Sequence, residues 1–141
     1  MIKVAFASTD RTRVNQHFGS AEGFVVYEVT PDKATLVGVA EFAEEAMDGN
    51  EDKLTAKVDF LEGCAAVYVM AIGASAIKKL MAKGIQPIRT NEVDAVDELL
   101  GEISKAMNDG GVAWIDRAIA AQTKAKAEDR FANMAEEGWE G

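Results

Sequence analysis

The order of the apolar segments along this chain constrains its fold more than any other feature. Three strand-like segments come first, and a turn at Thr30-Pro31-Asp32-Lys33 separates the second from the third. Proline presets φ in such a turn and aspartate can bond back to the backbone, so the second and third segments should form a hairpin. Beyond residue 50, helical and strand-like segments alternate. This pattern predicts an α/β domain.

Five strands and four helices are expected. The strands should span residues 2–8, 24–29, 34–42, 64–70 and 85–89, where apolar and β-branched side chains are concentrated. The helices should fill about 48–62, 75–83, 91–107 and 112–126, where apolar residues recur at helical spacing. Asn91 with Asp94 should cap the third helix. The second helix should turn Ile77, Leu80 and Met81 inward.

Strands that alternate with helices should run parallel and be joined by right-handed crossovers. The hairpin adds one antiparallel strand to the same sheet. A consistent arrangement is a five-stranded mixed sheet in the order 3-2-1-4-5, with strand 2 antiparallel and helices on both faces. This three-layer α/β/α architecture is the ribonuclease H-like motif.

In such a sheet the chain winds in opposite directions from strands 1 and 4, which opens a crevice at their carboxyl ends. The loop that leaves strand 1 carries Arg11, Arg13 and His17. The loop that leaves strand 4 runs from Met70 to a helix start at Gly73. The topology therefore predicts that these two loops lie together and form the candidate site.

His17 is the only histidine in the chain. At the crevice it could bind a metal or cluster through a neutral imidazole, or transfer protons near neutral pH. The ordinary alternative is a loop histidine that caps a turn or faces water. Phe18 should anchor the loop in the core, and Gly19 should tolerate a positive φ.

Other groups near the crevice suit an anionic ligand. Arg11 and Arg13 could hold it through charge-assisted hydrogen bonds, although arginines in loops are more often simply solvated. The turn at Gly73, Ala74 and Ser75 directs the amides of a helix start into the crevice, which favours an anion. Small residues at such a junction are also just good packing.

Two sulfur-bearing residues differ in their expected roles. Met70 lies at the crevice end of its strand, where a thioether could bind a soft metal, but methionine more often fills a core. Cys64 lies at the other end of the same strand, and free cysteine is among the most buried residue types. We therefore expect Cys64 to be a packing residue.

Charge and composition disfavour several other classes of protein. A formal net charge of −9 argues against nucleic-acid binding, and no apolar segment is long enough to span a bilayer. The single cysteine and the lack of a signal-peptide pattern in MIKVAFAST indicate a cytoplasmic protein. The chain has no Walker loop and no GxGxxG motif, and strands 1 and 4 lack the acidic residues of a two-metal nuclease.

Long stretches of the sequence resemble one known family. VAFASTDRTRVNQHFGSAEGFVVYEV and DGNEDKLTAKVDFLEGCAAVYVMAIGASAIKKLMAKGIQPI are followed near the C-terminus by RFANMAEEGWE. The HFGS loop, the DGNEDKL segment and the GASA junction resemble, in order and spacing, the NifX/NafY family of nitrogenase iron-molybdenum cofactor biosynthesis proteins. The related VnfX-like proteins of vanadium nitrogenase are similar as well.

The resemblance implies a ribonuclease H-like fold and a small carrier without enzymatic activity. Such a carrier binds an iron–sulfur precursor of the nitrogenase cofactor, made by NifB, and passes it towards the NifEN scaffold. The histidine of the family's HFG motif corresponds to His17, which is therefore the expected cluster ligand. The adjoining Phe18, Gly19 and Ser20 complete the expected binding loop.

Residues 1–111 should form this cofactor-binding α/β domain, with a C-terminal helix and tail, residues 112–141, packed on it. Two other interpretations stay open. The protein could be a chaperone that recognises nitrogenase assembly partners without a cluster, through its acidic surface and the tail from Phe131 to Trp139. It could also be an α/β domain that holds a small anionic metabolite in the same crevice.

Overall fold

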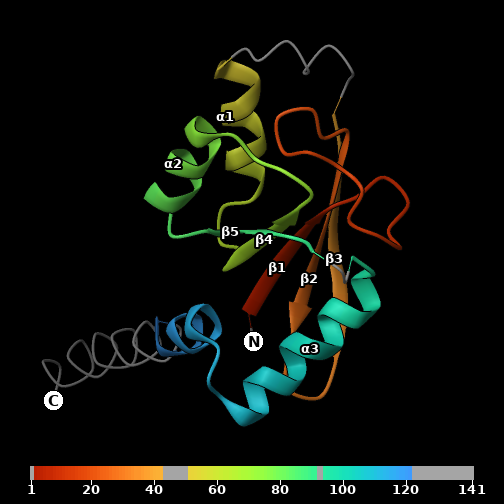
Figure 1. The fold of residues 1–141 in the computed structure, drawn as a ribbon, viewed down its shortest axis with the longest axis vertical. Helices are drawn as coiled ribbons and strands as arrows, with labels where there is room; N and C mark the ends of the chain where they lie inside the picture. The colour runs from red at the N-terminus through yellow and green to blue at the C-terminus, as the bar shows by residue number, and fades with distance from the viewer. Residues whose placement is uncertain (1, 43–50, 92–93, 122–141) are drawn as a thin grey trace, which may run out of the picture.

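A five-stranded mixed sheet forms the centre of the computed structural model, which describes residues 2–42, 51–91 and 94–121 (Figure 1). The strands are β1 (Ile2–Ala7), β2 (Gly23–Val29), β3 (Ala34–Glu41), β4 (Ala66–Val69) and β5 (Gln86–Arg89). They lie in the order β3-β2-β1-β4-β5; β2 is antiparallel to β1 and β3, whereas β1, β4 and β5 run parallel. The predicted order and the antiparallel placement of strand 2 are confirmed, and each strand begins and ends within two residues of its predicted bounds.

Helices cover both faces of the sheet, which gives three layers (Figure 1). α1 (Glu51–Phe60) and α2 (Ala74–Ala82) pack on one face, and α3 (Val96–Asp109) packs on the other together with a helix at 113–121. Alternate residues of β1 enter different cores: Ala5 and Ala7 pack with α1 and α2, whereas Val4 and Phe6 pack with α3. A strand covered on both faces reads as a continuous apolar segment, which is why β1 was recognisable from the sequence.

The inward face of α2 differs from the prediction. Ala76 and Leu80 are buried in the core, but Ile77 and Met81 are 37% and 53% exposed. α2 packs against β5 at the edge of the sheet, so only a narrow stripe of this nine-residue helix reaches the core. The prediction was right for Leu80 and wrong for Ile77 and Met81.

α3 begins at Val96, later than predicted, and no side chain caps it. The segment before it is paired with the loop after β1. The Val14 N–H donates to the Asp94 carbonyl at 2.8 Å, and the Val96 N–H donates to the Thr12 carbonyl at 2.9 Å. Because these backbone bonds hold the segment in an extended conformation, the predicted cap by Asn91 and Asp94 is wrong.

The helix at 113–121 joins the same core as α3. Ile115 is buried there, and Trp114, Ala118 and Ile119 pack against this core. The rest of the predicted last helix and the aromatic tail, residues 122–141, lie outside the described residues. Within the described ranges, no helix has both the length and the apolar character needed to cross a membrane.

Candidate functional site

The loop after β1 and the segment after β4 lie side by side at the carboxyl ends of these two strands. His17 and Ala71 form an isolated parallel bridge. The Phe18 N–H donates to the Ala71 carbonyl at 2.8 Å, and the Met70 N–H donates to the Gln16 carbonyl at 3.0 Å. These bonds continue the side-by-side arrangement of β1 and β4 beyond the strands. The two loops that the topology placed at one crevice are therefore joined directly.

His17 is presented at the surface by a buried neighbour. The Phe18 side chain is fully buried and packs edge-on against Phe24, with 5.6 Å between the ring centroids. Successive side chains of a bridged, strand-like segment lie on opposite sides, so burial of Phe18 leaves His17 exposed. Gly19 does not have the positive φ expected of it, and an added Cβ there would meet no atom within 4 Å. The predicted anchoring of the loop by Phe18 is confirmed, whereas a positive φ is not the reason for a glycine at position 19.

A buried lysine holds this loop from the core side. The Lys57 side chain comes from α1 and is only 1% exposed. Its Nζ donates to the Gly19 carbonyl at 2.8 Å and to the Phe18 carbonyl at 3.4 Å. Nζ also lies 5.8 Å from the centre of the Phe42 ring, within the range of a cation–π contact. Burial lowers the pKa of Lys57, because the charged ammonium loses solvation.

Sequence reasoning missed Lys57, although the sequence carries a signal for it. The residue lies three positions after Leu54 and four before Leu61, beside Val58 on the apolar stripe of α1. A lysine on a buried stripe needs polar partners, because an unpaired buried charge is costly. Here those partners are the main-chain carbonyls of the His17 loop.

Replacing Lys57 with methionine should lower the free energy of unfolding by about 1–3 kcal/mol, because two carbonyls lose their donor while the apolar stem is retained. The backbone amide of Phe18 should also exchange faster with solvent, since its loop is less restrained. Urea denaturation and hydrogen exchange measure these two effects. Lys78→Met, at an exposed position of α2, is the matched control and should change stability by less than about 0.5 kcal/mol. Equal effects of the two substitutions would contradict this role of Lys57.

Asp10 organises the part of the loop nearest β1. Its carboxylate accepts hydrogen bonds from the backbone N–H of Arg13 at 3.0 Å, the backbone N–H of Thr12 at 2.8 Å and the Ser8 hydroxyl at 3.2 Å. These bonds lower the pKa of Asp10, because they favour its charged form. Arg11 has a φ of 65° within this turn, and its N–H donates to the Ser8 hydroxyl oxygen at 3.0 Å. Short-range hydrogen bonds therefore determine where both arginines leave the backbone.

The two arginines lie in different surroundings. The Arg13 guanidinium is 3.7 Å from the Asp94 carboxylate, in an exposed ion pair of the kind that adds little stability. Arg11 lines a separate hollow of about 300 Å³, together with the acidic Glu41. Among the described residues, neither guanidinium bonds to the segment around His17. The structure brings together the two loops but does not join the predicted arginines to the imidazole.

The first turn of α2 follows the segment that pairs with the His17 loop. Gly73 is its N-cap without a side-chain cap hydrogen bond, and Gly73, Ala74 and Ser75 are exposed. The first turn holds no acidic residue, so the positive end of the helix dipole is not offset there. Met70 is 44% exposed, so it is not core filler. This surface can offer an anion backbone donors beside an imidazole and a thioether.

Cys64 lies away from this surface, before the start of β4. It is buried, and burial raises the pKa of its thiol to about 11. A protonated, buried thiol agrees with the packing role expected of Cys64. No group of three or more histidine, cysteine, aspartate or glutamate side chains is arranged for a metal ion in the described parts of the chain.

Comparison with known proteins identifies a family. Residues 1–106 match the family model described as dinitrogenase iron-molybdenum cofactor. The NifX protein of Azotobacter vinelandii is 47% identical over 140 residues, which cover 99% of this chain and 88% of that protein. The FeMo cofactor biosynthesis protein NifB of Frankia alni is 35% identical over 108 residues, which cover 73% of this chain and 21% of that longer protein.

The fold also has a counterpart among solved structures. The crystal structure of PH0822 superposes with a TM-score of 0.54 at 24% identity, over 77% of this chain and 90% of that chain. At this identity the likeness supports the fold alone. The family model covers most of the α/β domain, and the likeness to NifX extends over nearly the whole chain. The chain therefore belongs to the dinitrogenase iron-molybdenum cofactor family, in agreement with the resemblance seen in its sequence.

Proposed function

We propose that this chain takes part in maturation of the nitrogenase cofactor as a cytoplasmic carrier. It binds an iron–sulfur precursor and passes it between assembly proteins of the NifB and NifEN types. The observation that carries the proposal is the exposed His17 imidazole on a loop fixed by the buried side chains of Phe18 and Lys57. Membership of the family supplies the chemical class of the cargo, and the likeness to part of a NifB protein supports a shared cargo.

A single imidazole suits a cargo that arrives already assembled. The irons of such a cluster are coordinated largely by its own sulfides, so the protein has to supply few ligands. A neutral imidazole is a good ligand for iron. Because only a small number of protein ligands holds the cluster, a partner protein can take it over by ligand exchange. No covalent bond of a substrate has to be made or broken, so we regard the protein as a carrier and not an enzyme.

The groups around His17 would offset the negative charge of a cluster. We assign the amides of Gly73, Ala74 and Ser75 hydrogen bonds to cluster sulfides, because they begin a helix beside the imidazole loop. Met70 is joined to the same loop through its backbone and offers a soft thioether.

The arginines would act on the cluster in different ways. Arg13 could leave Asp94 and pair with the cluster instead, since its ion pair with Asp94 is exposed and weak. Arg11 would act only over a longer distance, because it lines the neighbouring hollow. We therefore expect substitution of either arginine to weaken cluster binding less than substitution of His17.

Anaerobic titration of the apo-protein with the NifB-derived cluster, followed by size exclusion, tests this function. We expect iron and visible absorbance to co-elute with the wild-type protein. His17→Ala should weaken retention roughly tenfold or more, as loss of a metal-site contact commonly does. His17→Cys should restore retention, because a thiolate also ligates iron. Lys78→Ala, at an exposed position of α2, is the control and should behave as wild type.

The other outcomes separate the competing functions. If the wild-type protein retains no cluster, the carrier function is overturned and partner recognition without a cluster becomes the better explanation. If wild type and His17→Ala retain it equally, the ligand is not His17. Thermal protection by a small anion, independent of iron, would instead indicate a metabolite-binding domain.

A further inference from the structure

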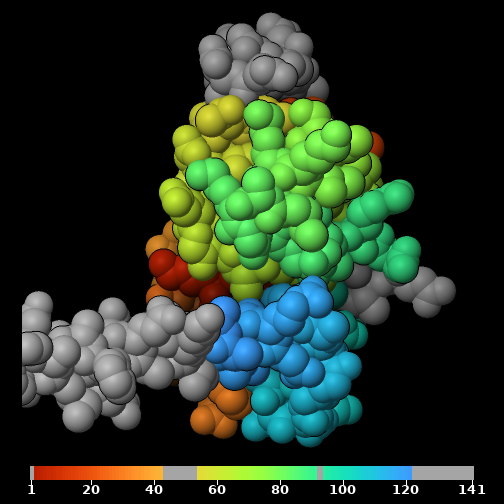
Figure 2. Space-filling model, turned by 90° about the vertical axis from the view of Figure 1, so that its left-hand side faces the viewer, coloured from red at the N-terminus to blue at the C-terminus, as the bar shows by residue number. Residues whose placement is uncertain are grey.

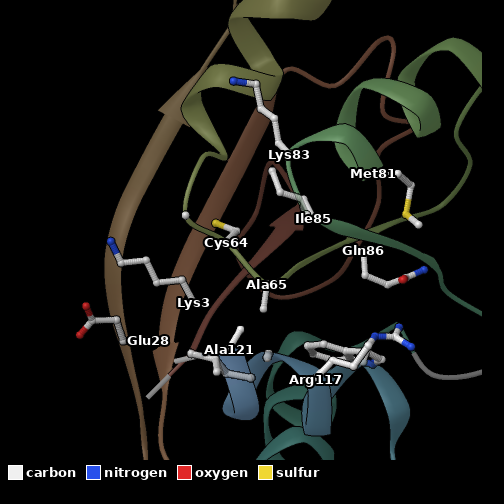
Figure 3. A pocket seen from close by; sticks show the side chains of 15 residues that line it. Lys3, Glu28, Cys64, Ala65, Met81, Lys83, Ile85, Gln86, Arg117 and Ala121 are labelled. Carbon is white, nitrogen blue, oxygen red and sulfur yellow. The ribbon is translucent and has the colours of Figure 1, made fainter. Parts of the chain in front are cut away.

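A groove of about 860 Å³ lies at the end of the sheet opposite to His17. Figure 3 shows the side chains that line it. The starts of β1 and β5 and the residues just before β4 form one wall, whereas the His17 loop leaves the carboxyl end of β1. The facing wall belongs to the helix at 113–121 and includes Trp114 and Arg117. In Figure 2 the helices on either side of the groove, green α2 and the blue helix at 113–121, face the viewer. This groove takes no part in the site described above.

Much of the groove lining is apolar. Ile2, Ile85 and the Cys64 thiol line it opposite Trp114. Met81, which was predicted to face the core, lines the groove instead and is 53% exposed. A concave apolar surface of this size is a candidate for coverage by another segment or molecule.

Basic side chains outnumber acidic ones along the groove. Lys3, Lys83 and Arg117 line it, against Glu28 as the acidic residue among the described lining residues. Lys83 is already paired with Asp59 at 3.5 Å. Arg117 has no ion pair with any residue of the described ranges, and in Figure 3 it lies across the groove from Lys3. The groove therefore favours an acidic occupant with apolar side chains.

We propose that the C-terminal segment 131–141 of the same chain occupies this groove. The described part of the chain ends at Ala121, which itself lines the groove, and twenty residues follow it. The last eleven, FANMAEEGWEG, contain Phe131, Met134, Trp139 and three glutamates, and no basic residue. One segment that follows Ala121 in the sequence thus combines apolar side chains that suit the apolar lining of the groove with acidic side chains that suit its basic residues.

The tether from Ala121 is long enough for this docking. Residues 122–130 span ~14 Å as a helix and up to ~30 Å when extended. A short tether also holds the segment at an effective concentration of about 1 mM, so weak contacts are sufficient. Glutamates 136, 137 and 140 would then face Lys3 and Arg117, in contacts that salt weakens. The docking is independent of cluster binding at His17.

Fluorescence quenching in the full-length protein tests the proposal. Trp139→Phe keeps an aromatic anchor and leaves Trp114, in the groove, as the only tryptophan. In this background, Arg117→Glu should raise the acrylamide quenching constant of Trp114 about twofold, because release of the segment opens the indole to solvent. Lys78→Glu makes the same change of charge on the exposed side of α2 and should leave quenching unchanged.

A second variant tests the segment instead of the groove. The double substitution Phe131→Ser with Met134→Ser should raise quenching of Trp114 by a similar factor without lowering the thermal midpoint. Unchanged quenching in both this variant and Arg117→Glu overturns the proposal. If the protection of Trp114 from acrylamide is lost when the protein is diluted, the proposal is overturned as well, because the groove would then bind the C-terminal segment of a second copy.

Discussion

Phe18→Ala should lower the free energy of unfolding by about 3–5 kcal/mol, the range expected when a large buried aromatic side chain is truncated. The Phe18 ring is fully buried against Phe24. Its backbone N–H bonds to Ala71, and its carbonyl accepts a bond from Lys57. The residue therefore joins the His17 loop, the segment after β4 and α1. A loss of this size is a large share of the roughly 5–15 kcal/mol that stabilises a typical domain.

Urea denaturation at neutral pH measures the effect on stability. Phe18→Leu keeps an apolar side chain of similar volume and should cost less than about 1.5 kcal/mol. Phe18→Ala should also reduce cluster retention at temperatures where the protein is still folded, because the loop that carries His17 loses its anchor. If the alanine variant lost less than about 1 kcal/mol, the loop would have to be anchored by other contacts.

Raising the pH from 8 to 10.5 should lower the stability of the wild-type protein by roughly 3 kcal/mol through two buried acids. Burial raises the pKa of Cys64 from 9.0 to about 11, although the nearby Lys3 charge opposes this. Burial, reinforced by the Glu102 carboxylate, raises the pKa of Tyr68 from 10.0 to about 12. Both groups ionise at lower pH in the unfolded chain, so the unfolded state then binds fewer protons and stability falls as the pH rises. Their contribution is complete below pH 9, falls as the pH rises above the unfolded pKa of each group, and is fully lost once the pH has passed about 11 for Cys64 and about 12 for Tyr68.

Cys64→Ala and Tyr68→Phe each remove one of these groups. The double variant should lose most of the alkaline decrease in stability, measured as urea midpoints at the two pH values with a reductant present. Lys57 acts in the opposite direction, because its lowered pKa lets the folded state release a proton below the ordinary value of 10.5. A double variant with the pH dependence of wild type would show that neither buried acid is responsible.

Much of the sheet was predictable because its signals are local or follow from handedness. The turn at residues 30–33 indicated the hairpin, and the strand order proposed as consistent with right-handed crossovers is the one observed. The neighbourhood of His17 and Met70 then followed from topology and is observed. Helix faces and caps were harder to predict. Asp94 carries the sequence signal of a cap, yet its backbone pairs with Val14 and keeps the segment extended.

The sequence by itself determined the α/β class, the strand order, the buried position of Phe18 and the one histidine that can serve as a ligand. These properties depend on periodicity and on connections between neighbouring elements, which a sequence records directly. Only the tertiary structure decided that Lys57 is buried under the His17 loop, that Arg13 pairs with Asp94 and that a groove opens at the other end of the sheet. These features depend on contacts between side chains from distant segments of the chain. Such contacts are decided by differences of a few kcal/mol between burial and charge pairing, which is of the same order as the net free energy of unfolding. No local sequence pattern encodes that outcome.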